Sequence, residues 1–179
     1  NPHLAPNGKR WLAEMYAKKV FEVFFRGEDR NMLIAGAKVS GKKVVLTLRV
    51  PEPPIVIDTW TVSAKTNYGF MVYSNNNGTL TALQTDSVIT DDDKVIITLA
   101  QEPEPGSTLT VTYANSDVGG KGNVRDSGAW KSLGLYTSNE NTAGSTIPYD
   151  EDGNTIIGKR YPMQAWLPQC AIDINVPSE

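Results

Sequence analysis

His3 is the residue of this chain best suited to acid and base chemistry, because it is the one histidine and an imidazole changes its charge near neutral pH. A histidine that acts as a general base needs a nucleophile to deprotonate and an acid that orients its ring. The sequence offers two Asp-Ser pairs, Asp86-Ser87 and Asp126-Ser127. Neither pair follows a glycine or stands in an expected strand-to-helix turn, so we interpret both as loop residues.

Aromatic side chains could form a platform on which sugar rings stack, since an aromatic face covers the apolar side of a pyranose. The candidates are Trp60, Trp130, Tyr136, Tyr161 and Trp166. We prefer Trp130 and Tyr136 as substrate-binding residues because they lie in a long loop, and core packing is the alternative for all five. Arg125 lies in the same loop and could hydrogen-bond a carbohydrate, although an Arg125-Asp126 pair that pins the loop is equally reasonable.

The sequence predicts neither a metal site nor a cofactor. Cys170 is the one cysteine, and no Cys and His set has the spacing of zinc ligands. The run Asp150 to Asn154 resembles a calcium loop, but its glycine falls one place too early and the closing glutamate is missing. We therefore predict a hairpin turn there.

The charge balance argues against nucleic acid as a partner. The chain has 17 Lys and Arg against 20 Asp and Glu, a formal net charge of −3, whereas nucleic-acid-binding surfaces present clustered cations. No apolar run approaches the roughly 18 residues that a membrane-spanning helix needs. We therefore expect neither nucleic acid nor a membrane as a partner.

An amphipathic helix is predicted directly after His3, over residues 8–26. Leu12, Met15, Tyr16 and Val20 recur at the three- and four-residue steps of one helical face. Pro6 or Asn7 can start the helix and Gly27 can end it. Further aromatic residues widen the apolar surface, so we expect this helix to be buried against something large, either the rest of this chain or a sheet outside it.

After the helix the hydrophobic period changes from 3.6 residues to two. The segment 43–50 alternates Val44, Leu46, Leu48 and Val50 with a second face, and 94–99 and 108–113 repeat the pattern. Further strands are expected over 33–39, 55–58, 69–73, 80–85 and 171–176, and residues 115–168 are expected to be a long loop. The prediction is a mainly β chain: an Ig-like or jelly-roll antiparallel β-sandwich preceded by one α-helix.

The opening PHLAPNGKRWLAEMYAKKV resembles the last conserved block of SGNH, or GDSL-type, hydrolases. In that family a D-x-x-H pair stands just before a final helix that bears Leu-Ala. Here His3-Leu4 precede Gly8 and Leu12-Ala13 at matching offsets. The rest resembles the β-sandwich that follows the histidine helix in sialate-O-acetylesterase-like proteins and in SGNH proteins of bacteria and phage tails, through AKVSGKKVVLTL, YGFMVY, DKVIITL, TLTVTYA and GNVRDS.

The resemblance implies an activity and the parts that would carry it. His3 would be the base of a serine-type carbohydrate esterase that removes O-acetyl groups, so the implied partners are an acylated carbohydrate and an N-terminal SGNH catalytic domain. The implied division is 1–28 as the terminal histidine block and helix, and 29–179 as an accessory sandwich. The family's acid would stand one position before Asn1, so this chain alone is expected to be inactive. The implied location is secreted, periplasmic or virion-associated.

A function of a different class stays open. The chain could be a non-catalytic carbohydrate-binding or phage-tail interaction module, with its helix docked on the sandwich. In that case Trp130 would matter for binding and His3 would not.

Overall fold

The computed structural model describes residues 4–137 and 148–178. Helix α1 (Pro6–Val20) starts with proline in its first turn, and it continues as a single π-helical turn, η1 (Phe21–Phe25). Gly27 follows with a φ of 68°, a left-handed conformation that suits glycine. The predicted helix is confirmed. Asn7 is not its cap, because the residue at that position is Ala5.

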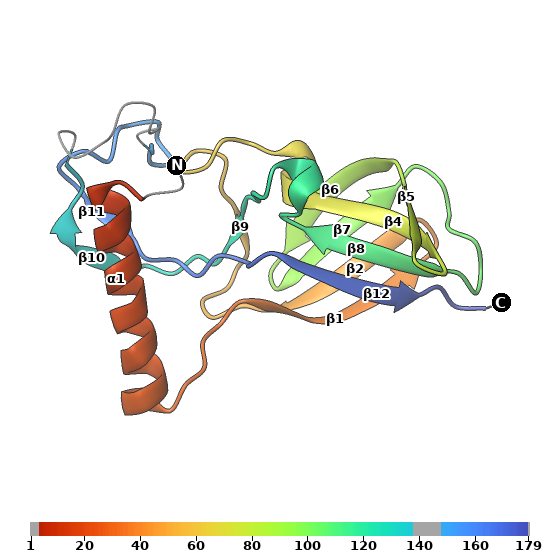
Figure 1. Ribbon diagram of the computed structural model, residues 1–179, viewed down its shortest axis with the longest axis horizontal. Coiled ribbons are helices and arrows are strands. Elements are labelled where there is room, and N and C mark those ends of the chain that lie inside the picture. The colour runs from red at the N-terminus through yellow and green to blue at the C-terminus, as the bar shows by residue number, and fades with distance from the viewer. Residues whose placement is uncertain (1–3, 138–147, 179) are drawn as a thin grey trace.

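Two four-stranded antiparallel sheets form the larger part of the molecule (Figure 1). One sheet has the order β1 (Leu33–Ser40), β2 (Lys43–Arg49), β7 (Lys94–Leu99), β6 (Thr85–Asp91). The other has the order β12 (Cys170–Asn175), β8 (Thr108–Tyr113), β4 (Phe70–Asn76), β5 (Thr79–Ala82). The fold is mainly β and consistent with a β-sandwich, as the alternation of the sequence predicts.

The core of the sandwich comes from the inward faces of both sheets, where alternate residues along each strand are apolar and buried. One sheet contributes Val44, Leu46, Leu48, Val95, Ile97 and Leu99, and the other contributes Phe70, Val72, Leu109, Val111 and Tyr113. Burial of these faces fixes the register, since a shift by one residue would turn each apolar set to solvent.

The remaining elements are short. They are η2 (Thr66–Gly69), η3 (Ser116–Val118), and two-stranded pairings of β3 (Val56–Ile57) with β9 (Val124–Arg125) and of β10 (Lys131–Leu135) with β11 (Arg160–Pro162). Segment 80–85, predicted as one strand, is instead the end of β5 and the start of β6. The predicted loop over 115–168 contains β9, β10 and β11 in its described part.

A second, smaller hydrophobic cluster covers one face of α1. Tyr136, Ile156, Tyr161 and Met163 form it, and Trp11 and Met15 of the helix pack against them. Figure 1 shows α1 beside β10 and β11 at one end of the molecule, with the two large sheets at the other end. The helix is therefore held by the segment around β10 and β11. The expected domain boundary at residue 28 stays a prediction.

None of the helices in the described ranges is long and apolar enough to cross a membrane.

Candidate functional site

His3 lies outside the described residues, which begin at Leu4. Its catalytic role therefore stays a prediction. The helix that follows it, α1, is described from its first residue.

The start of α1 is tied to the segment after β10 by a buried asparagine. Asn7 donates through Nδ2 to the backbone oxygen of Thr137 at 2.7 Å, and its Oδ1 accepts from the Thr137 backbone N–H at 3.2 Å. Arg10 Nη2 also donates to this Oδ1, at 2.7 Å. Buried amides are stable when their donors and acceptors are paired in this way, so the position of the helix start is well fixed.

Hydrogen bonds fix the same face of the helix along its length. The Trp11 indole N–H donates to the Pro162 carbonyl at 3.2 Å. Lys18 Nζ donates to the Met163 carbonyl at 2.9 Å. Burial lowers the pKa of the Lys18 ammonium. One face of α1 is thus committed to β10, β11 and the residues beside them.

The opposite face of the helix is apolar and exposed. It consists of Leu12, Tyr16, Val20, Val23 and Phe24, which we call the open helix face. Tyr16 is 66% exposed and Phe24 is 79% exposed. Phe21 and Phe25, whose rings stack at 5.9 Å, extend the apolar surface at its C-terminal end. A helix with two apolar faces, one packed and one in solvent, has a surface suited to a further partner.

Arg125 is part of a buried ion pair between β9 and the turn after β3. Its Nε donates to Asp58 Oδ2 at 2.7 Å, and Nη1 donates to the Asp126 carbonyl at 2.7 Å. The guanidinium carbon lies 5.4 Å from the centre of the Trp60 ring. Asp58 in turn accepts the backbone N–H of Thr61 at 2.7 Å, so one carboxylate fixes both the arginine and the turn that carries the tryptophan. Arg125 does pin its loop, but through Asp58.

A pocket of about 470 Å³ lies beside this ion pair, and we call it the Trp60 pocket. Its lining includes Trp60, Arg125, Lys131, Tyr149, Arg160 and Gln164. Three parts of the chain meet there: the turn after β3, the segment from β9 to β10, and the segment that leads to and follows β11. Aromatic and hydrogen-bonding side chains converge on one hollow, which is the composition of a binding site for a small polar ligand.

Tyr136 and Trp130 lie outside this pocket. Tyr136 is buried with its ring edge-on to Tyr161 at 6.4 Å, and it lines an apolar pocket of about 470 Å³ together with Leu4 and Trp11. Trp130 is 40% exposed, and Lys18 Nζ lies 5.3 Å from the centre of its ring. Arg125, Trp130 and Tyr136 line three different pockets, which are neighbours but contain only one of these side chains each.

Sequence reasoning found Trp60 and Arg125 but missed Lys131, Arg160 and Gln164. These three residues stand in or next to β10 and β11, which have no regular alternation to reveal them. The sequence did contain one signal that could have indicated these residues: basic and amide side chains lie beside Trp130 and Tyr161.

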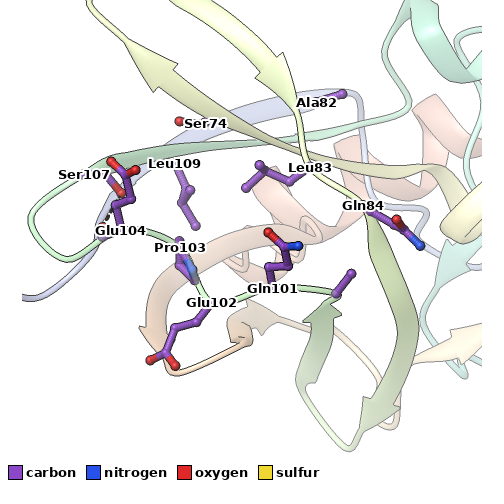
Figure 2. Close-up of a pocket in the computed structure, with 11 residues that line it drawn as sticks. Ser74, Ala82, Leu83, Gln84, Gln101, Glu102, Pro103, Glu104, Ser107 and Leu109 are labelled. Carbon is purple, nitrogen blue, oxygen red and sulfur yellow. Dashed lines mark hydrogen bonds between the residues drawn. The ribbon is translucent and has the colours of Figure 1, made fainter.

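Another pocket, of about 450 Å³, lies where the β5–β6 link faces the connection between β7 and β8. Figure 2 shows Leu83, Gln101 and Leu109 between these segments, while the carboxylate of Glu102 points away from them. Ser107 Oγ donates to the Glu104 backbone oxygen at 2.6 Å and is engaged in the turn. Its lining, as far as the structure describes the chain, contains no imidazole, thiol or basic side chain, so we assign no chemistry to it.

No group of three or more His, Cys, Asp or Glu side chains gathers as for a metal ion within the described residues. The predicted turn at Asp150 is confirmed: Asn154 N–H donates to Asp150 Oδ1 at 2.8 Å, and Tyr149 pairs with Thr155. Lys159 Nζ donates to Asp150 Oδ2 at 2.6 Å, and this hydrogen bond lowers the pKa of the Asp150 carboxyl.

No protein-family model matches the sequence, and no curated protein matches it. Among solved structures, the chain is similar to the N-terminal part of the bacterial S-layer protein SbsC, with a TM-score of 0.46, 12% identity, and coverage of 92% of this chain and 27% of that one. It is also similar to XAC1771, a carbohydrate acetylesterase from Xanthomonas citri, with a TM-score of 0.44, 17% identity, and coverage of 63% and 24%.

The archaellum periplasmic stator protein FlaG from Sulfolobus acidocaldarius matches with a TM-score of 0.30 and 19% identity over 52% of this chain and 93% of that one. This chain spans about a quarter of the length of SbsC and of XAC1771, at 27% and 24%. At these identities and TM-scores the likenesses assign neither a family nor an activity.

Proposed function

We propose that this chain is the C-terminal part of a carbohydrate ester hydrolase, in which α1 carries His3 to a catalytic domain and the β-sandwich is an accessory module. The substrate is an O-acylated carbohydrate. His3 takes the proton of a serine hydroxyl as that oxygen attacks the ester carbonyl, and it then returns the proton to the leaving alkoxide. The serine, the acid that orients His3 and the oxyanion donors belong to the catalytic domain.

The observation that carries this proposal is the open helix face. Its five apolar side chains follow directly on the histidine block and stay in solvent, although the other face of the same helix is packed. Exposed contiguous apolar patches of more than a few hundred Å² typically mark interfaces in soluble proteins. In the resembled family, the helix after the histidine packs on the α/β catalytic domain, which would cover this surface.

The second support is the rigidity of the other face. Asn7, Trp11 and Lys18 hold the helix on β10, β11 and their flanking residues by hydrogen bonds of 2.7 to 3.2 Å. A base that works in a triad must be held within a few tenths of an ångström of its partners. A helix fixed on one side by the accessory module and on the other by the catalytic domain would give His3 such a position.

Hydrolysis of a chromogenic acetate ester tests the proposal. The 179-residue chain alone should be inactive. The polypeptide that includes the preceding catalytic domain should be active, and His3→Ala should lower its kcat by several orders of magnitude because a triad acts as a unit. Hydrolysis by the chain alone that survives His3→Ala would contradict the proposal. So would a coding sequence with a residue other than aspartate directly before Asn1.

Docking on the open helix face has its own test. A separately produced catalytic domain should bind this chain, and Tyr16→Ser or Phe24→Ser should weaken that binding. Ile89→Ser is the matched control, because Ile89 is 55% exposed on the edge strand β6 of the sandwich. Equal loss of binding in the control would place the interface elsewhere.

A further inference from the structure

Gln164 in the Trp60 pocket has an unsatisfied polar atom. Its side chain is only 8% exposed, and Oε1 is buried without a hydrogen-bond partner among the described residues. A buried carbonyl oxygen left unpaired costs about 1–3 kcal/mol relative to a paired one, so native proteins rarely leave one without a reason. A ligand hydroxyl that donates to this oxygen would remove the cost.

Arg125 presents a fixed donor to the same pocket. Nε and Nη1 are held by Asp58 and by the Asp126 carbonyl, while Nη2 has no recorded partner within the described part of the chain. Because the guanidinium lies over Trp60 and is paired on its other edge, its plane cannot rotate freely. The donor therefore loses little conformational entropy when a ligand binds.

The charges around the pocket favour an anion. Lys159 is paired with Asp150 at 2.6 Å, and Arg125 is paired with Asp58. Lys131 and Arg160 also line the pocket, and neither has an ion-pair partner among the described residues. Of the lining carboxylates, Asp150 is paired with Lys159, and Glu151 has no ion-pair partner among the described residues. The unpaired lining charges therefore sum to an excess of positive charge, although the whole chain has a net charge of −3.

Aromatic side chains supply the apolar part of the pocket. Trp60 lines it beneath the guanidinium, and Tyr149, which is 48% exposed, lines it from the turn before Asp150. Aromatic faces pack against the C–H groups of a pyranose, while planar amide and guanidinium groups hydrogen-bond its hydroxyls. A simple inorganic anion would use the cations but leave the rings and Gln164 without a role.

We propose that the Trp60 pocket is a binding site for an acidic carbohydrate, a pyranose that carries a carboxylate. The carboxylate lies at Lys131 and Arg160, and ring hydroxyls pair with Gln164 and with Nη2 of Arg125. This inference extends the proposed function and rests on it for the assignment of the ligand to the carbohydrates. None of its lining residues comes from α1, so we assign the bound polymer to the accessory module.

Calorimetric titration of the full chain with trigalacturonate tests this site, and maltotriose and acetate serve as comparison ligands. Trigalacturonate should bind, and the two others should bind at least about tenfold more weakly. Maltotriose lacks the carboxylate, and acetate lacks the sugar ring and its hydroxyls. Lys131→Gln and Arg160→Gln should each weaken trigalacturonate binding by about tenfold, the size expected for loss of one charge-assisted hydrogen bond. Both side chains are exposed, so neither change should unfold the protein.

Lys43→Gln is the matched control, because Lys43 is an exposed lysine on β2 of the sandwich that does not line the pocket. Equal weakening by Lys43→Gln, equal binding of maltotriose, or full competition by acetate would each overturn the proposal, as would a failure of trigalacturonate to bind. His3→Ala should leave binding unchanged. Failure of ester hydrolysis with intact trigalacturonate binding would therefore refute the catalytic proposal and leave this site in place.

Discussion

Arg125 Nε lies 2.7 Å from Asp58 Oδ2, and both residues are buried, with 8% of Arg125 and 1% of Asp58 exposed. The pair joins β9 to the turn after β3, between the large sandwich and the end of the molecule that carries α1 (Figure 1). Among the described residues, each charge is compensated by the other, by neighbouring backbone groups and, for Arg125, by the ring of Trp60. The pair therefore fixes the positions of Arg125 and Trp60 in the Trp60 pocket. It also stabilises the connection between the sandwich and the end of the molecule that carries α1.

Removal of the guanidinium should destabilise the protein strongly. Arg125→Ala leaves Asp58 buried without its cation, and such a loss typically costs about 3–5 kcal/mol. The free energy of unfolding, measured by urea denaturation, should fall by that amount. Arg26→Ala is the control: Arg26 and Glu28 lie 3.3 Å apart with both side chains 41% exposed, and an exposed pair of this kind contributes less than about 1 kcal/mol. Similar losses in the two variants would refute the assignment.

A methyl group at Gly122 should be poorly tolerated. A Cβ there would lie 2.2 Å from the Oη of Tyr113, a buried ring whose hydroxyl accepts the Val124 N–H at 2.9 Å. Gly122→Ala forces the ring or the backbone to move, so we expect a loss of about 1–3 kcal/mol in the free energy of unfolding. Gly36→Ala should change it by less than about 0.5 kcal/mol, because no atom of the described residues lies within 4 Å of a Cβ there. Equal effects in thermal denaturation would show that this close approach is wrong.

The large strands could be predicted from the sequence because one face of each is buried. Val44, Leu46 and Leu48 alternate on β2, and the core requires that alternation. Strand β6 was missed because Val88 is its one buried residue, so an edge strand with one solvated face has almost no apolar period. The short strands β9, β10 and β11 contain two, five and three residues, too few for a period to show.

The site was predictable only in part. Arg125 and Trp60 could be named as candidates from residue type alone, but Asp58 is 67 residues before Arg125 in the chain. Their contact depends on the two-residue pairing of β3 with β9, which leaves no pattern in the sequence. The breadth of the apolar helix surface predicted burial against something large. Within the described residues only the face with Trp11 and Met15 is packed, while the open helix face is exposed.

The two faces of α1 should differ in their contribution to stability. Trp11→Ala removes a ring packed on the Tyr136 cluster and the hydrogen bond to Pro162, so the free energy of unfolding should fall by about 2–4 kcal/mol. Tyr16→Ala, on the open helix face, should change it by less than about 0.5 kcal/mol. Chemical denaturation of the two variants gives the comparison. A larger loss for Tyr16→Ala would mean that the helix docks through the other face.

Asp126 should make the protein less stable as the pH rises. Burial raises the pKa of its carboxyl, although the backbone N–H groups of Ala165 and Gly128 donate to Oδ1. Oδ2 is buried and has no hydrogen-bond partner in the described part of the chain. The folded state therefore keeps this proton in a pH window above the unfolded-state pKa of about 3.9, where the unfolded chain has lost it. The contribution of Asp126 to stability is greatest below that window and declines as the pH rises through it to the folded-state pKa.

Asp126→Asn removes this titration, so the difference in the free energy of unfolding between the variant and the parent chain should shift in favour of the variant from pH 4 to pH 7. Urea denaturation at several pH values within that range measures it. A difference that stays constant with pH, or that shifts in favour of the parent chain, would mean that the buried carboxyl is charged in the folded protein at low pH. In that case the positive charge of Lys18, which favours the ionised carboxyl of Asp126, would be the cause, and Lys18→Met should restore the pH dependence.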